Sequence, residues 1–408
     1  MPGRVTAVLT AIAAPLVAGI AAAGGPLIVD TDGSLLVWGT ASAIPYRTDG
    51  GPLSSQVTNA QAQTRVRNMF DVWQDVASAS ISYSRAGAIL DTGVFTDGDV
   101  STAAEFNDVE GDCFDGNQSP IVFDVDGSMF EDLGEDPSVI GFAGPCAANG
   151  AGNIVSGRAV MNGIYLDGID SSGNPELTSA EFDAAFVHEF GHLSGLDHSQ
   201  ININCLQQGC GNDNLEGLPT MFPILLHASQ GSLSTDDIAW ISRLYPAGGA
   251  SGFAATHGTI RGIVYFSDGE SHVQFANVIA RHVEAGGNED RRIAVSNVAG
   301  YRFRACVPND ITPPPPSFYC PQSGSLNPGH TGLFEIPVPA GTYTLEIESI
   351  DPAFTGGSRV GPGDRPLPLP GTVPPPSAPI SIAAGETKSG NHVTLIGTPP
   401  RFDSFESP

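Results

Sequence analysis

One stretch of eleven residues constrains this chain more than any other, because a helix and one turn would bring its three histidines together. His188 and His192 are four residues apart, so an α-helix presents both on one face with Cβ atoms about 5–6 Å apart. Gly195 can adopt the left-handed conformation that ends a helix, and the resulting turn returns His198 towards the pair. Three neutral imidazoles leave a fourth position on a metal ion open, as in catalytic zinc sites. Glu189 would lie beside the metal without binding it and could accept a proton from water.

The alternative interpretation is a buried amphipathic helix that merely contains three histidines. The shorter pattern HExxH arises by chance in many proteins, whereas the pattern here fixes five positions. Buried histidines without partners are also energetically costly, which favours metal binding. Thr178 and Glu181 form a capping-box pattern that predicts the beginning of the helix.

The charge of the chain excludes some classes of partner. It has 17 basic and 44 acidic side chains and a formal net charge of −27. We therefore expect neither nucleic acid nor an anionic membrane surface as a partner. Residues 86–157 contain fourteen Asp and Glu and no Lys or Arg. Asp124 and Asp126 follow a predicted strand at 121–123 and are candidate calcium ligands, with a solvated acidic loop as the alternative.

Residues 1–23 have the pattern of a secretory signal peptide. Arg4 precedes a mostly apolar run at residues 5–20, and alanines occupy 21–23. A membrane anchor is the alternative, but the run is short for a bilayer span. No later stretch is long and apolar enough to cross a membrane. We therefore expect a secreted, extracellular protein without a transmembrane span.

An exported chain is expected to use its six cysteines in disulfides. None of them forms a CxxC pattern, which makes zinc ligation by cysteine the less favoured alternative. Six cysteines allow fifteen connectivities. Proximity in the sequence favours Cys113 with Cys146, Cys205 with Cys210, and Cys306 with Cys320.

The part of the chain between the signal peptide and residue 247 mixes helical and strand patterns. Besides the histidine helix, apolar periodicity predicts helices at 58–76 and 234–245. The acidic stretch 91–136 is expected to be loop-rich. Residues 158–161 and 164–166 alternate as a strand before the histidine helix. In a zinc peptidase this would be the edge strand along which an extended substrate pairs its backbone. Short strands are predicted at 35–38, 44–46, 81–83 and 121–123.

The chain changes character after a glycine-rich stretch, 248–256, which predicts a flexible linker. Residues 258–266, 278–283 and 341–347 alternate with period two, and no helical period appears there. We therefore predict a β-sandwich over 257–397 and a mobile tail over 398–408.

The motif, written His188-Glu-Phe-Gly-His192-Leu-Ser-Gly195-Leu-Asp-His198-Ser, is followed 23 residues later by Met221 in a turn. A helix ending at Tyr245-Pro246 comes next. Together these features resemble the matrixin branch of the metzincin metalloproteases over residues 34–246.

The resemblance implies an α+β catalytic domain with one twisted sheet, three main helices and a cleft across the sheet. It also implies His188, His192 and His198 as zinc ligands, Glu189 as general base, and Met221 as the apolar floor beneath the metal. Two departures from the family pattern stand out. No histidine precedes His188, so we do not expect the second, structural zinc of the family, and the cysteine-containing inhibitory pro-peptide is missing.

Residues 258–266 and 339–345 are similar to the carboxypeptidase-regulatory, transthyretin-like β-sandwich. This similarity implies an accessory module, without chemistry of its own, that binds a protein or a cell-surface partner. The combined expectation is a secreted zinc endopeptidase acting on a protein or peptide substrate. The alternative is a secreted binding or adhesion protein that uses a protease-like scaffold, which the intact ligands and Glu189 argue against.

Overall fold

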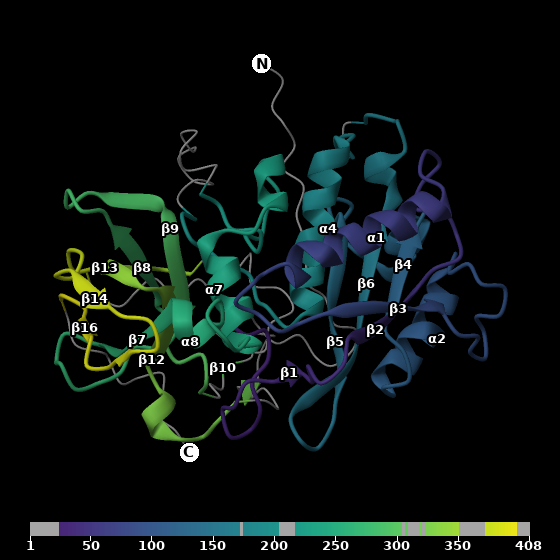
Figure 1. Ribbon diagram of the computed structural model, residues 1–408. Coiled ribbons are helices and arrows are strands. Elements are labelled where there is room, and N and C mark those ends of the chain that lie inside the picture. Colours follow the sequence, from purple (N-terminus) through teal and green to yellow (C-terminus); the bar gives the residue numbers. More distant parts are fainter. Residues whose placement is uncertain are drawn as a thin grey trace.

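A computed structural model describes the greater part of the chain. The described residues are 24–171, 174–203, 217–303, 307–308, 318–319, 324–350 and 372–397. The predicted signal peptide 1–23 and the predicted tail 398–408 lie outside them. The fold is a mixture of sheets and a few helices, arranged as two regions that lie side by side (Figure 1). Within the described ranges, no helix has the length and apolar character needed to cross a membrane.

The first region is built on a six-stranded sheet. Its strands follow the order β1-β6-β4-β2-β3, and β5 pairs with the other side of β6. All the pairings are parallel except that of β5, which runs antiparallel to β6. The strands are β1 (Val37–Trp38), β2 (Ile44–Thr48), β3 (Tyr83–Ala88), β4 (Pro120–Asp124), β5 (Gly141–Ala148) and β6 (Asn153–Asn162).

The prediction of an edge strand at 158–166 is wrong. Residues 153–162 form β6, which is flanked by β4 and β5, and residues 163–166 form a 3₁₀ turn, η1 (Gly163–Leu166). Nearly every residue of β6 is buried, as expected of a strand covered on both faces. The strand at this edge of the sheet is instead β5, and β3 forms the opposite edge. The glycines, alanines and proline of β5 give it little strand propensity.

Two helices predicted from apolar periodicity cover one face of this sheet (Figure 1). They are α1 (Asn59–Gln74) and α4 (Ser179–Leu193), and each begins at a capping box, that of α4 being Thr178 with Glu181. The rings of Phe70 and Phe190 stack with centroids 3.8 Å apart. The indole N–H of Trp73 in α1 donates to the carbonyl of Val187 at 2.8 Å. The histidine helix is therefore fixed against α1 along its length.

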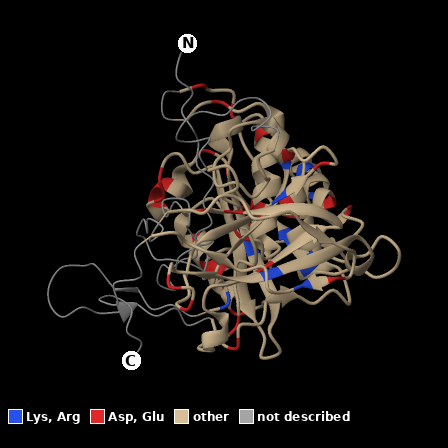
Figure 2. Ribbon diagram, turned by 90° about the vertical axis from the view of Figure 1, so that its left-hand side faces the viewer, with Lys and Arg blue, Asp and Glu red and all other residues tan. Residues whose placement is uncertain are grey.

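The acidic stretch 91–136 is not loop-rich throughout, which corrects the expectation. It contains α2 (Ala103–Phe114) and α3 (Ser128–Leu133), and both pack on the opposite face of the sheet. The buried side of α2 consists of Phe106, Val109, Glu110 and Cys113, at helical spacing among partly exposed acidic positions. Acidic positions are spread over the molecule rather than confined to this stretch (Figure 2).

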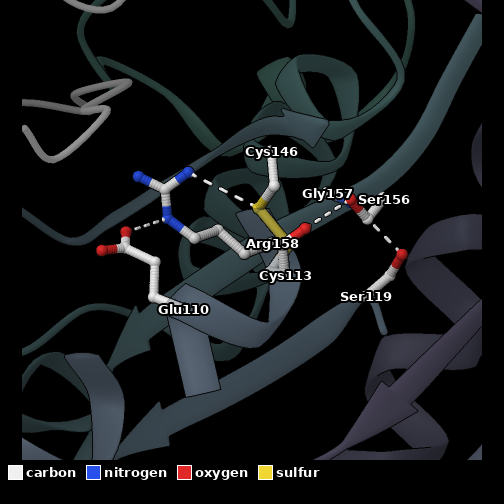
Figure 3. The surroundings of a disulfide bond; sticks show 7 residues. All are labelled: Glu110, Cys113, Ser119, Cys146, Ser156, Gly157 and Arg158. Carbon is white, nitrogen blue, oxygen red and sulfur yellow. Dashed lines mark hydrogen bonds and ion pairs between the residues drawn. A yellow bond between two sulfur atoms is a disulfide. The ribbon is translucent and has the colours of Figure 1, made fainter. Parts of the chain in front are cut away.

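A disulfide between Cys113 and Cys146 joins α2 to β5, and confirms that predicted pairing. The other four cysteines lie outside the described residues. Beside the disulfide, the buried guanidinium of Arg158 forms an ion pair with Glu110 at 2.6 Å (Figure 3). The disulfide therefore attaches the edge strand to α2, and the ion pair attaches α2 to β6.

The second region consists mainly of two four-stranded sheets, shown at the left of Figure 1. Buried side chains from both, such as Ile260, Phe334 and Leu345, belong to one apolar cluster that continues into the first region. Within the predicted linker lies a short helix, α8 (Phe253–Thr256). One sheet contains β7 (His257–Tyr265), β12 (Leu333–Pro339), β15 (Thr387–Lys388) and β16 (Val393–Thr394), and the other contains β8 (Asn277–Val283), β9 (Glu289–Val298), β13 (Gly341–Glu348) and β14 (Ile380–Ile382). The smaller elements of this region are β10 (Val307–Pro308), β11 (Phe318–Tyr319) and η3 (Pro328–His330), whereas η2 (Ala228–Gly231) lies against α4 in the first region.

Candidate metal centre

The three histidines of the motif meet in the interior of the first region. Nε2 of His192 lies 3.0 Å from Nε2 of His188 and 3.2 Å from Nε2 of His198. All three side chains are buried. Among the described residues they are the one group of His, Cys, Asp and Glu side chains gathered closely enough to hold a metal ion.

The hydrogen bonds of two rings determine where their protons lie. Nδ1 of His188 is 2.8 Å from the carbonyl oxygen of Thr220, and Nδ1 of His192 is 2.8 Å from that of Leu196. A carbonyl can only accept, so each Nδ1 carries the proton and each Nε2 presents a lone pair. Burial lowers the pKa of His188 well below its usual range and that of His192 to about 4. Both rings are therefore neutral at physiological pH, and their converging lone pairs could hold a cation.

The turn after the helix is the one that the glycine predicts. Gly195 has φ of +88°, in the left-handed region. The amide of Gly195 donates to the carbonyl of His192, and the amide of Leu196 to that of Gly191, each at 2.9 Å. This closure of α4 reverses the chain and brings His198 back to the other two rings.

Glu189 is fully buried beside the histidines, and neither of its carboxylate oxygens has a hydrogen-bond partner among the described residues. Burial raises its pKa well above the usual range. Gly141 at the start of β5 lies against it, because a Cβ at that position would be 3.1 Å from Cγ of Glu189. A buried carboxyl group without partners is costly, and such groups concentrate at functional sites.

Met221 lies directly beneath the helix, where its sulfur occupies the space that a Cβ at Gly191 would need. The carboxylate of Asp237 accepts from the amides of Thr220 at 2.8 Å and Met221 at 3.0 Å. The amide of Ser199 donates to the carbonyl of Met221 at 2.7 Å. The turn therefore contacts both ends of the histidine motif.

Two residues that complete this arrangement were missed as site residues. Asp237 also caps α7 (Thr235–Leu244), where it accepts from the amide of Ser234 at 2.7 Å. That the same carboxylate also accepts from the amides of Thr220 and Met221 is not visible in the sequence. Gly141 lies in a stretch with weak strand propensity, and no local pattern distinguishes it.

The candidate calcium ligands lie away from this group and already have partners. The carboxylate of Asp124 accepts from the amides of Gly127 at 3.0 Å and Phe130 at 2.9 Å. Asp126 accepts from the amide of Ser128 at 3.1 Å. These bonds fix the start of α3, and no third carboxylate among the described residues joins the pair. Calcium binding here stays a prediction.

No protein-family model matches this chain, and no curated protein is detectably similar to it in sequence.

Proposed function

We propose that this protein is a secreted zinc-dependent endopeptidase with a matrixin-like catalytic domain. The observation that carries the proposal is the convergence of three Nε2 atoms beside the buried, unpartnered carboxyl group of Glu189. An apolar core helix would need neither feature.

The donor set favours zinc among the common metal ions. The group consists of three neutral imidazoles and no carboxylate, whereas calcium and magnesium prefer oxygen ligands. Zinc–nitrogen bonds of 2.0–2.1 Å in a tetrahedron hold the nitrogens roughly 3.3 Å apart. The observed separations of 3.0 Å and 3.2 Å are close to that spacing. Three protein ligands leave a fourth position for water or substrate.

A zinc ion bound there would lower the pKa of water to about 7 and polarise the carbonyl of a peptide. Glu189 would take the proton from the attacking water, since it follows His188 directly and has no competing partner among the described residues. Its raised pKa suits a group that must hold this proton and then return it to the leaving amine. His188 and His192 stay neutral and oriented through their Nδ1 hydrogen bonds.

The position of β5 supports an extended peptide as the substrate. This strand pairs only with β6 among the described strands, so its outer edge is free to pair with another backbone. Its first residue, Gly141, lies against Glu189. A peptide added along β5 would therefore pass the candidate metal centre.

Secretion and the accessory role of a C-terminal β-sandwich are parts of the same proposal. The disulfide Cys113–Cys146 supports an oxidising compartment. The two sheets of the second region, with a shared apolar core, support the sandwich.

Metal removal tests the proposal as a whole. We expect casein cleavage by the full chain to stop after treatment with a zinc chelator and to return when zinc is restored. Calcium or magnesium added in place of zinc should not restore it. Cleavage that continues in metal-free protein would refute a zinc peptidase.

A further inference from the structure

The loop that carries His198 is paired along its length with the first described residues of the chain. The amide of Gly24 donates to the carbonyl of His198 at 2.6 Å, and the amide of Leu27 to that of Gly195 at 2.8 Å. Between them, the amide of Asp197 donates to the carbonyl of Gly25 at 3.0 Å. These bonds form a short antiparallel pair, so the backbone of the third histidine cannot shift independently of residues 24–27.

The other side of residues 24–27 lies against β9 of the second region. A Cβ at Gly24 would come within 2.5 Å of the carbonyl oxygen of Ser296. The side-chain amide of Asn297 donates to the carbonyl of Gly24 at 3.4 Å. Gly24 and Gly25 are therefore enclosed between the His198 loop and β9.

β9 is in turn attached to α7 through two buried side chains. Asp236 accepts from the amide of Ser296 at 2.7 Å, and the indole N–H of Trp240 donates to the carbonyl of Ser296 at 2.7 Å. The hydroxyl oxygen of Ser199, the residue after His198, lies 3.5 Å from that of Ser296. Ser296 of β9 therefore contacts α7, Gly24 and the loop that carries His198.

An apolar layer extends this contact. Ile201, three residues after His198, packs with Ile279 of β8 and Ala294 of β9 in a buried cluster. Ile279 and Ser296 are register partners, and alternate residues of a strand point to the same face. The face of this sheet opposite its own core therefore covers the segment that follows the third histidine.

We infer that β9 is a structural part of the metal centre, and that Asp236 and Trp240 are positioning residues for His198. They act by holding Ser296 against residues 24–27 and the ligand loop. The inference rests on the proposed zinc site. It changes the role of the second region from an accessory module to a component that sets metal affinity.

The test is zinc affinity in the full chain, measured by competition with a chromogenic chelator. We expect Asp236→Ala to weaken zinc binding by about 10-fold or more, the effect typical of groups that orient ligands. Asp236→Asn keeps an oxygen to accept from Ser296 and should bind zinc as the wild type does. Arg292→Ala changes an exposed residue of the same strand and serves as the matched control. Thermal unfolding of each metal-free variant reports separately on the fold.

Weaker zinc binding in Asp236→Ala, restored in Asp236→Asn, would establish the positioning role. A lowered unfolding temperature with unchanged zinc affinity would overturn it, because that result describes stability alone. If Asp236→Ala does not fold, Trp240→Phe decides, since it removes the N–H donated to Ser296 and keeps an aromatic ring at this buried position. Unchanged zinc affinity in that variant would also overturn the inference. Absence of zinc from wild-type protein would instead refute the metal centre itself.

Discussion

Nδ1 of His188 donates to the carbonyl oxygen of Thr220 at 2.8 Å, which joins the first histidine of the motif to the turn that contains Met221. The amides of this turn donate to the carboxylate of Asp237, so one chain of hydrogen bonds runs from α7 to the candidate metal ligand. The orientation of the imidazole therefore depends on a residue almost fifty positions away in the sequence.

Removing the carboxylate of Asp237 should loosen this turn. Asp237→Ala leaves the amides of Thr220, Met221 and Ser234 without their acceptor in a buried place. We expect the free energy of unfolding to fall by about 3 kcal/mol and zinc affinity to fall with it. Urea unfolding and chelator competition measure the two effects. A fall in stability with intact zinc affinity would show that the turn does not orient His188.

Gly141 should be required for the placement of Glu189. In Gly141→Ala, the new Cβ would come within 2.9 Å of the carbonyl oxygen of Val160 and 3.1 Å of Cγ of Glu189. We expect casein cleavage to fall about 10- to 100-fold through misplacement of the carboxylate, with zinc content unchanged. Gly144→Ala on the same strand is the control, because its nearest neighbour is 3.8 Å away, at Leu27. Equal activity of both variants would contradict the assignment.

The disulfide should stabilise the first region through its loop length. Cys113 and Cys146 are separated by 33 residues. Closing a loop of that size lowers the entropy of the unfolded chain and so raises its free energy by about 3.7 kcal/mol. We expect the double alanine variant to lose stability of that order in urea. Because Cys146 lies on β5, cleavage of casein should fall as well. Unchanged stability in the double variant would show that the link contributes little beyond the packing around it.

Asp236 should make the stability of the protein depend on pH. Burial raises the pKa of Asp236 to about 8, whereas the carboxyl group is ionised above about 4 in the unfolded chain. Its folded form holds a proton that the unfolded form releases, so its contribution to stability is full below pH 4. That contribution declines as pH rises towards 8, by on the order of 4 kcal/mol at pH 7. Asp236→Asn should remove this decline. The free energy of unfolding is measured against pH for both proteins, and the same dependence in each would contradict the role of Asp236.

The sequence predicts the local geometry of the site better than the elements around it. The spacing of the histidines, the capping box at Thr178 and the left-handed Gly195 depend on neighbours within one or two turns, and the structure confirms the cap and the turn. Which strand forms the edge depends on which strand pairs with the outer side of β6. No pattern within Gly141–Ala148 indicates that this segment does so. The sequence analysis did not predict α2, because its buried face is narrow and the acidic residues around it obscure the helical period.

Contacts between residues far apart in the sequence could not be predicted either. The role of Ser296 depends on contacts with Asp236 and Trp240, which are separated from it by about sixty residues. An alternating strand pattern indicates one buried face, but it does not show that the second face is covered by another region. Only the folded structure brings these residues to the loop of His198.

The most direct test of the account compares wild-type protein with Glu189→Gln, both produced from the whole sequence. Zinc content and casein cleavage are measured on the same preparations, with His192→Ala as the variant that should lose both. Glutamine keeps the size of the side chain but cannot take a proton, so we predict one zinc ion in each protein and cleavage reduced about 10²- to 10⁴-fold in the variant. Full activity in Glu189→Gln, or no zinc in the wild type, would contradict the central claim.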